Sequence, residues 1–145
     1  MIEELYAYAL LLEAGLVKIT EYGEYLDTHF LLEPDNSILL ELEWCFSDTQ
    51  KSISTIRNYC SDYSIDYDVF GQFLFSKLEE TYLQNKLSLK DFSTKSYMIW
   101  QQFPDKVHQT EPFWTLCYAD DPLSWGDEKQ TRELYEKAFR YYDDS

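Results

Sequence analysis

Residues 2–17 read IEELYAYALLLEAGLV, and this stretch decides the fold class. Its apolar side chains recur at steps of three and four, the spacing that aligns them along one side of an α-helix. Gly15 lies near the end of the stretch, at a place where a helix can stop. The stretch therefore predicts an apolar helix, and similar spacing returns along most of the chain.

Helix-capping residues divide the rest of the sequence. Thr20, Asp48, Ser88 and Asp127 each precede a helical pattern and have side chains that can accept hydrogen bonds from first-turn amides, and residues 34–37 (PDNS) offer both a break and a cap. Few Gly and Pro residues argue against a β-rich chain. The expected helices after the first are residues 20–32, 38–46, about 49–63, about 68–85, about 89–103 and about 128–142.

Two segments depart from this simple pattern. Residues 38–46 could form a strand, but we expect a helix because Leu and Glu dominate, with Leu39, Leu42 and Trp44 on its apolar side. Between residues 105 and 126 the periodicity fails at two prolines and Gly126. The sequence predicts an all-α protein of about seven short antiparallel helices, forming one domain over residues 1–145 as a compact bundle or a curved stack of helical hairpins.

Charge is the most unusual feature of the composition. The chain has 27 acidic and 12 basic residues, a net charge of −15 and 45% hydrophobic residues, too many for a disordered acidic tail. Such a charge repels nucleic-acid phosphates and anionic membranes, so neither is an expected partner. It attracts basic proteins, although the same charge also serves solubility.

Cysteine usage and the N-terminus suggest a reducing compartment. Cys45, Cys60 and Cys117 are odd in number and widely spaced, which is typical of buried thiols and not of disulfides. The N-terminus lacks the positive region of a signal peptide, and the apolar run 7–12 is too short to span a bilayer. We expect a cytoplasmic protein.

Catalytic and metal-binding motifs are not evident in the sequence. Neither His29 nor His108 has a second His or a Cys at the spacing that metal sites use. We expect His29 to be a packed helix residue and His108 to be a solvated loop residue. The stretch that contains Asp62, Asp66 and Asp68 lacks the glycine and the terminal glutamate of an EF-hand calcium-binding loop. Glu41 and Glu43 are the best acid–base pair, but we expect both to face solvent. From the sequence we therefore expect a protein that is not an enzyme and that binds no cofactor or metal.

Two stretches combine acidic and aromatic residues, a composition suited to a basic protein partner. Carboxylates accept the two-pronged hydrogen bonds of arginine, and aromatic rings stack on its guanidinium plane. The alternative is that these rings fill the core while the aspartates cap helices. The predicted partner-binding residues form cluster 1 (Asp62, Tyr63, Asp66, Tyr67 and Asp68) and cluster 2 (Tyr118, Asp120, Asp121, Trp125 and Asp127).

The first third of the chain resembles a known family. The run LYAYALLLEAGLV (5–17), the triplet Tyr25-Leu26-Asp27, a turn at Pro34 and LLEL (39–42) are similar to helical immunity proteins of bacterial contact-dependent inhibition and other polymorphic-toxin systems. In that family the triplet resembles Trp-Ala-Asp. The resemblance implies a cognate toxin as partner, often a nuclease, and supplies no catalytic residues.

These observations lead to a prediction of function and to its alternatives. The chain is expected to be an immunity protein that is monomeric when free and forms a heterodimer with a basic toxin. The alternative is an acidic adaptor or nucleic-acid mimic that binds another basic protein. An enzyme is the third reading, against which the absence of a nucleophile or ligand set argues.

Overall fold

The structure is a computed structural model that describes the backbone of residues 1–144 and the side chains of residues 1–143. All regular structure in the described part is helical, which confirms the all-α prediction. The chain divides into two compact units, unit 1 (Met1–Asp66) and unit 2 (Tyr67–Ser145). Each is described by itself below, and the expectation of a single domain stays a prediction.

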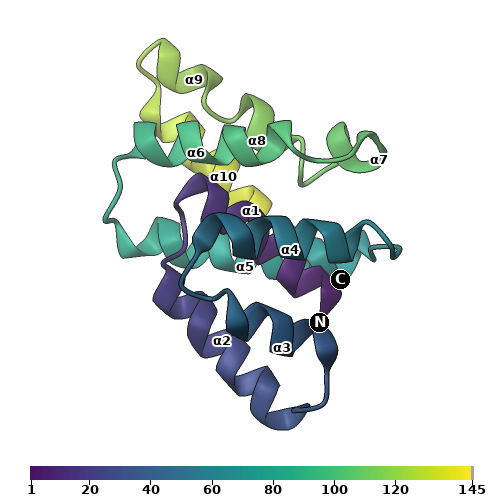
Figure 1. Cartoon of the computed structure of the whole chain (residues 1–145). Coiled ribbons are helices and arrows are strands. Elements are labelled where there is room, and N and C mark those ends of the chain that lie inside the picture. Colours follow the sequence, from purple (N-terminus) through teal and green to yellow (C-terminus); the bar gives the residue numbers. More distant parts are fainter. Residues whose placement is uncertain (145) are drawn as a thin grey trace. The chain divides into compact units, whose positions relative to one another are not determined.

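Unit 1 contains four helices, and its sequence explains where they start and stop. They are α1 (Ile2–Ala14), α2 (Ile19–Leu32), α3 (Ser37–Trp44) and α4 (Thr49–Cys60) (Figure 1). Gly15 ends α1 in the left-handed conformation with φ of 74°, as its position suggested. The side chain of Asn36 caps α3, and that of Asp48 caps α4 by accepting a hydrogen bond of 3.0 Å from the Lys51 amide. At α2 the predicted Thr20 cap is wrong, because the cap position is Lys18.

The core of unit 1 is aliphatic with a small group of rings. Helix α1 packs against α4, and α2 against α3, while α3 also contacts α4. The Tyr8 ring lies 4.9 Å from that of Tyr25 and 5.7 Å from that of Tyr22. Gly23 of α2 allows close approach of the Phe46 ring, whose Cζ would lie 2.7 Å from an added Cβ.

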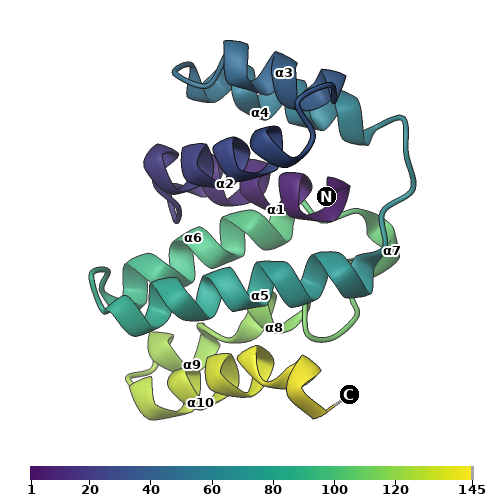
Figure 2. The same cartoon turned by 90° about the horizontal axis from the view of Figure 1, so that it is seen from below.

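Unit 2 contains three longer helices and several single turns. The longer helices are α5 (Tyr67–Gln84), α6 (Leu89–Gln101) and α10 (Glu128–Phe139), and α10 packs against α5 (Figure 2). The single turns are α7 (Asp105–His108), α8 (Thr115–Tyr118), α9 (Asp121–Ser124) and the 3₁₀ turn η1 (Tyr141–Asp144). Ser88 caps α6 and Asp127 caps α10, as predicted.

Aromatic rings dominate the core of unit 2. Phe70 stacks on Phe113 at 5.9 Å with an angle of 10° between the ring planes, and Phe103 meets Phe113 edge-on at 5.2 Å. A second group joins the N-terminal half of α6 to α10, with the Phe92 and Tyr135 rings 5.1 Å apart. These ring pairs hold α5, α6 and α10 in place around the shorter turns.

The helix count exceeds the seven expected. The described chain has ten α-helical segments, because residues 105–126, where periodicity fails, still form α7, α8 and α9. Proline and aspartate interrupt long helices but are compatible with single turns, and Pro122 occupies the first turn of α9. The last helix ends at Phe139 and not Tyr142.

Three side-chain placements also correct the sequence predictions. Trp44 is 83% exposed, because it lies one turn beyond exposed Leu40 and not on the side of Leu39. Glu43 is half-buried, and its Oε1 is fully covered. His108 is not a solvated loop residue, because its ring stacks 3.9 Å from that of Trp100. His29 is packed as expected, 4.3 Å from the Tyr25 ring.

Candidate partner-binding site

Cluster 1 follows α4 and divides between the two units. In unit 1, Asp62, Tyr63 and Asp66 are exposed, and 56% of the Tyr63 surface is open. The Tyr63 ring lies 4.9 Å from that of Tyr59, and burial is the main cause that raises the pKa of Tyr59. Tyr63 therefore offers an accessible aromatic surface held by a neighbouring ring.

The remaining residues of cluster 1 begin α5 in unit 2. Tyr67 is half-buried against Phe70, with ring centres 6.0 Å apart, and the Lys106 ammonium lies 5.8 Å from its ring centre. Burial raises the pKa of Tyr67. The adjacent Asp68 is exposed in the first turn of α5. Tyr67 is thus engaged within unit 2 and has less free surface than Tyr63.

Cluster 2 spans α8, α9 and the start of α10. Asp121 is exposed in the first turn of α9, and Trp125 is 66% exposed immediately after that turn. Tyr118 has a structural role, since its hydroxyl donates a 2.9 Å hydrogen bond to Glu111 Oε1. Asp127 caps α10 through a 3.0 Å hydrogen bond from the Gln130 amide. Asp121 and Trp125 are therefore the exposed side chains of cluster 2 that a partner can contact.

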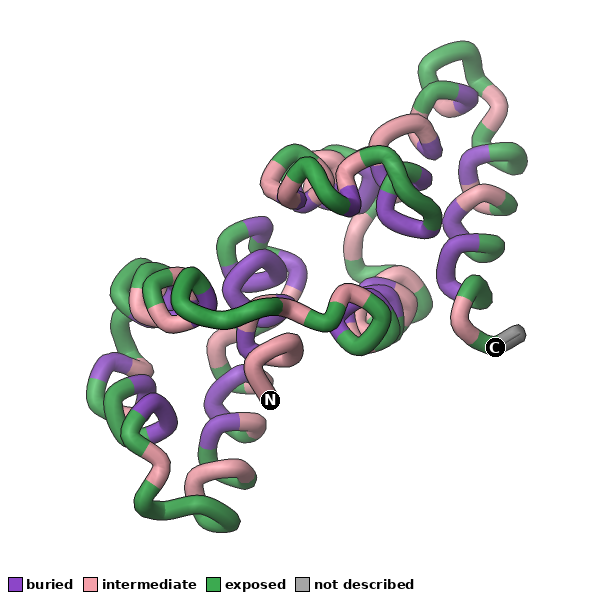
Figure 3. The backbone as a smooth tube through the Cα atoms, turned by 90° about the vertical axis from the view of Figure 1, so that its right-hand side faces the viewer, coloured by how far each residue is buried: buried purple, intermediate pink, exposed green. Residues whose placement is uncertain are grey.

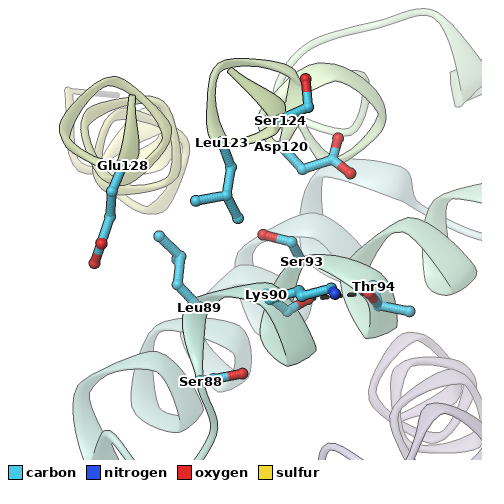
Figure 4. A pocket seen from close by; sticks show the side chains of 9 residues that line it. All are labelled: Ser88, Leu89, Lys90, Ser93, Thr94, Asp120, Leu123, Ser124 and Glu128. Carbon is cyan, nitrogen blue, oxygen red and sulfur yellow. Dashed lines mark hydrogen bonds between the residues drawn. The ribbon is translucent and has the colours of Figure 1, made fainter. Parts of the chain in front are cut away.

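Asp120, the fifth member of cluster 2, lines a pocket of about 720 Å³ in unit 2 (Figure 4). Burial is the main cause that raises the pKa of its carboxyl, and the neighbouring Asp121 contributes. The pocket is formed by the start of α6 on one side and by residues around α9 and α10 on the other. Its lining residues are Ser88, Leu89, Lys90, Ser93, Thr94, Asp120, Leu123, Ser124 and Glu128.

The pocket combines apolar and polar walls. Leu89 and Leu123 point toward each other across the gap between the two sides (Figure 4). The Ser93 hydroxyl accepts a 2.9 Å hydrogen bond from the buried Tyr135 hydroxyl. Lys90 is the one cation among the lining residues, and Asp120 and Glu128 are the two carboxylates. A site of this composition has room for a side chain inserted by a partner, with carboxylates to receive a positive end.

The sequence predicted only Asp120 among these pocket residues. Ser88 and Ser93 were missed as site residues because one serves as a helix cap and the other sits in an ordinary helical pattern. The pocket joins residues 88–94 to residues 120–128, and no local motif signals that pairing. Packing of α6 and α10 through their aromatic rings brings the two stretches together.

The two units differ strongly in charge. Residues 1–66 include 13 acidic and 3 basic residues, a net charge of −10, whereas residues 67–145 include 14 acidic and 9 basic residues, a net charge of −5. Charges on a surface act together on an approaching ion over about 10 Å at moderate salt. Unit 1 therefore presents the more strongly negative surface although it is the shorter unit.

Metal-ligand groups, thiols and membrane-spanning helices are further features that bear on function. No group of three or more His, Cys, Asp or Glu side chains is placed to hold a metal ion within residues 1–143. The three cysteines are free thiols; Cys45 and Cys60 are buried and Cys117 is partly buried, and burial raises the pKa of Cys60 to about 11. Across the described chain, no helix has the length and apolar character needed to cross a membrane.

Comparison with known proteins yields no relative. The chain matches no protein-family model, and neither a curated protein nor a solved structure is significantly similar to it.

Proposed function

We propose that this chain is an immunity protein that binds and neutralises a cognate bacterial toxin with a basic surface, of the nuclease type. The observation that carries the proposal is the combination of a net charge of −15 with exposed aromatic rings beside carboxylates, at Tyr63 and at Trp125. The resemblance of residues 5–42 to helical immunity proteins supports the choice of a toxin as partner.

Binding would proceed by electrostatic attraction followed by close packing. Opposite charge speeds the encounter of two proteins, and buried aromatic anchors then slow their separation. An arginine of the partner can bind both the carboxylates and the aromatic rings of clusters 1 and 2, because its guanidinium forms paired hydrogen bonds with a carboxylate and stacks on an aromatic ring. A nuclease needs a basic face to hold phosphates, and an acidic protein on that face blocks the substrate.

Co-expression tests the proposal most simply. Toxicity of a toxin encoded immediately upstream of this chain should vanish when the chain is co-expressed, and the two purified proteins should form a complex at low salt. Continued toxicity together with no complex at low salt would refute the pairing. A complex with a basic protein that is not a toxin would instead support the alternative function, an acidic adaptor or nucleic-acid mimic.

Charge reversal then tests the two predicted clusters. We expect Asp120→Lys with Asp121→Lys, or Asp62→Lys with Asp66→Lys, to weaken toxin binding about tenfold or more while helicity by circular dichroism stays unchanged. Glu133→Lys with Glu136→Lys is a matched control, because both side chains are exposed on α10 and the change in net charge is the same. If the control weakens binding equally, overall charge and not either cluster accounts for affinity.

A further inference from the structure

The hairpin of α2 and α3 exposes large apolar side chains that neither cluster includes. Trp44 is 83% exposed, Leu31 79%, Leu32 74% and Leu40 45%. Leu31 and Leu32 end α2, and Leu40 and Trp44 lie one turn apart on the exposed side of α3. The turn that joins the two helices is exposed as well (Figure 3). We call Leu31, Leu32, Leu40 and Trp44 the hairpin surface.

The apolar side chains of the hairpin surface are not needed for the core of unit 1. Tyr22 and Leu26 of α2 and Leu39 and Leu42 of α3 are fully buried and join the two helices. A solvent-exposed tryptophan gains nothing for folding and leaves apolar area in water. Exposed apolar groups on two helices that pack against each other, accompanied by exposed polar residues, mark a binding surface for another macromolecule.

Charge identifies the kind of partner. Residues 19–44 contain seven acidic residues and no Lys or Arg. Five of these acidic residues are exposed, and they come from both helices and from the turn between them: Glu24, Asp27, Glu33, Asp35 and Glu41. An anionic lipid surface or a second copy of unit 1, with its net charge of −10, would be repelled. A basic protein segment is attracted.

A pair of carboxyl groups between the two helices adds to this preference. Burial first, and then the nearby Asp27 carboxyl of α2, raise the pKa of the Glu43 carboxyl of α3. Glu43 Oε1 is covered and has no donor among the described residues. Two adjacent carboxylates repel each other, and a guanidinium or ammonium group placed beside them removes that repulsion. Asp27 is the exposed member of this pair, so its carboxylate is the one that a basic side chain can reach.

From these observations we infer that the hairpin surface is a docking site, in addition to clusters 1 and 2, for a basic protein segment that presents apolar side chains between its Lys and Arg residues. This inference rests on the proposed function in taking the toxin as the natural source of that segment. Trp44 acts as the central anchor, since an exposed tryptophan loses the most apolar area to a partner. Leu31 and Leu40 widen the apolar contact, and the surrounding carboxylates receive the basic side chains.

A synthetic peptide tests the surface without knowledge of the toxin. The probe is a labelled amphipathic peptide of about 20 residues made of Lys, Arg and Leu, titrated against the full chain by fluorescence anisotropy. Two comparison peptides replace Leu by Ser or the basic residues by Glu. We expect the chain to bind the Lys/Arg/Leu peptide at least tenfold more tightly than either comparison peptide, because the surface needs both charge and apolar area.

Variants locate the binding. Trp44→Ser should weaken peptide binding about tenfold or more, and Leu31→Ser with Leu40→Ser should weaken it several-fold. Val69→Ser with Leu83→Ser is the matched control, because these two apolar side chains are 43% and 70% exposed on α5 of unit 2. Circular dichroism should show equal helicity for all variants. Unchanged affinity of Trp44→Ser, or an equal loss in the control, would overturn the inference.

Protection and binding assays with the toxin distinguish a failure of this inference from a failure of the proposed function. If the wild-type chain protects cells from the upstream toxin and Trp44→Ser protects equally with unchanged affinity, the hairpin surface is not a docking site, although the immunity function stands. If the peptide binds the hairpin surface as expected but the wild-type chain gives no protection, the immunity function fails and the docking inference stands.

Discussion

Unit 1 and unit 2 are both built from short helices, yet they differ in core and surface. Unit 1 buries mostly aliphatic side chains, carries a net charge of −10 and leaves Trp44 and three leucines exposed on α2 and α3. Unit 2 is stabilised by contacts between aromatic rings, has nine of the twelve basic residues and contains a pocket of about 720 Å³. The comparison teaches that the acidity of the chain is concentrated in unit 1, whereas both units expose large apolar side chains, Trp44 in unit 1 and Trp125 in unit 2.

The largest expected effect on stability tests the aromatic core of unit 2. Phe70 is fully buried and contacts Phe103, Phe113 and Tyr67. Phe70→Ala should lower the free energy of unfolding by about 3–5 kcal/mol, the usual range for loss of a buried ring. Urea unfolding followed by circular dichroism measures the change. A loss below about 1 kcal/mol would contradict the central place of this ring in unit 2.

A glycine in each unit tests close packing. An added Cβ at Gly71 would lie 2.9 Å from Phe113 Cζ and 2.8 Å from Tyr142 Cζ, and one at Gly23 would lie 2.7 Å from Phe46 Cζ. Gly71→Ala should cost about 1–3 kcal/mol because Phe113 is buried and cannot move freely. Gly23→Ala should cost less, since the half-buried Phe46 can shift. The reverse order in thermal unfolding would show that unit 1 is the more tightly packed at these positions.

The buried hydrogen bond from Tyr135 to Ser93 provides a smaller test. Tyr135→Phe keeps the ring contacts with Phe92 and Phe139 and removes only the hydroxyl. The expected loss is about 1 kcal/mol, typical of one buried hydrogen bond. The double variant with Ser93→Ala should cost less than the sum of both single changes, because the two hydroxyls share one interaction. Strict additivity in urea titrations would contradict a direct contact.

The smallest expected effect on the free energy of unfolding comes from Glu43 of unit 1, and its contribution depends on pH. Burial first, and then the Asp27 carboxyl, raise the pKa of Glu43 above its ordinary value of 4.5. The folded chain therefore binds this proton more tightly than the unfolded chain, so stability from the protonated form is present below pH 4.5 and is lost as pH rises through the folded pKa. Ionised Glu43 weakens the fold at neutral pH.

Replacement of Glu43 removes that dependence. Glu43→Gln should raise the free energy of unfolding at pH 7 by up to about 1 kcal/mol and change it little at pH 4. Glu41→Gln is the matched control on the same helix, because Glu41 is exposed. Equal stabilisation by the two variants at pH 7 would mean that general charge repulsion, and not the contact with Asp27, destabilises the wild-type chain.

Local features explain how much of the fold the sequence predicts. The caps at Asp48, Ser88 and Asp127 and the stop at Gly15 follow from side chains acting on their own helix, so the pattern locates them. The turns between residues 105 and 126 could not be placed, because their helical hydrogen bonds are too few to create a periodic pattern.

The candidate sites depend more on tertiary packing. The aspartates at positions 62, 66 and 121 were expected on the surface and lie there. Trp44 was placed on the wrong side of its helix, since a ring of that size is usually buried and the short helix allows either choice. The pocket around Asp120 joins stretches about thirty residues apart, which only the packing of α6 and α10 reveals.

The central claim is the proposed binding of a basic toxin in which the hairpin surface takes part, and it is tested most directly by the affinity of the full chain for a toxin encoded immediately upstream. Calorimetric titrations at about 0.05 M and about 0.5 M salt would compare the wild-type chain with Trp44→Ser. The account predicts tight wild-type binding that weakens as salt rises, and an affinity about tenfold or more lower for Trp44→Ser at both salt concentrations. Absence of binding at low salt, or salt-independent binding that Trp44→Ser leaves unchanged, would contradict it.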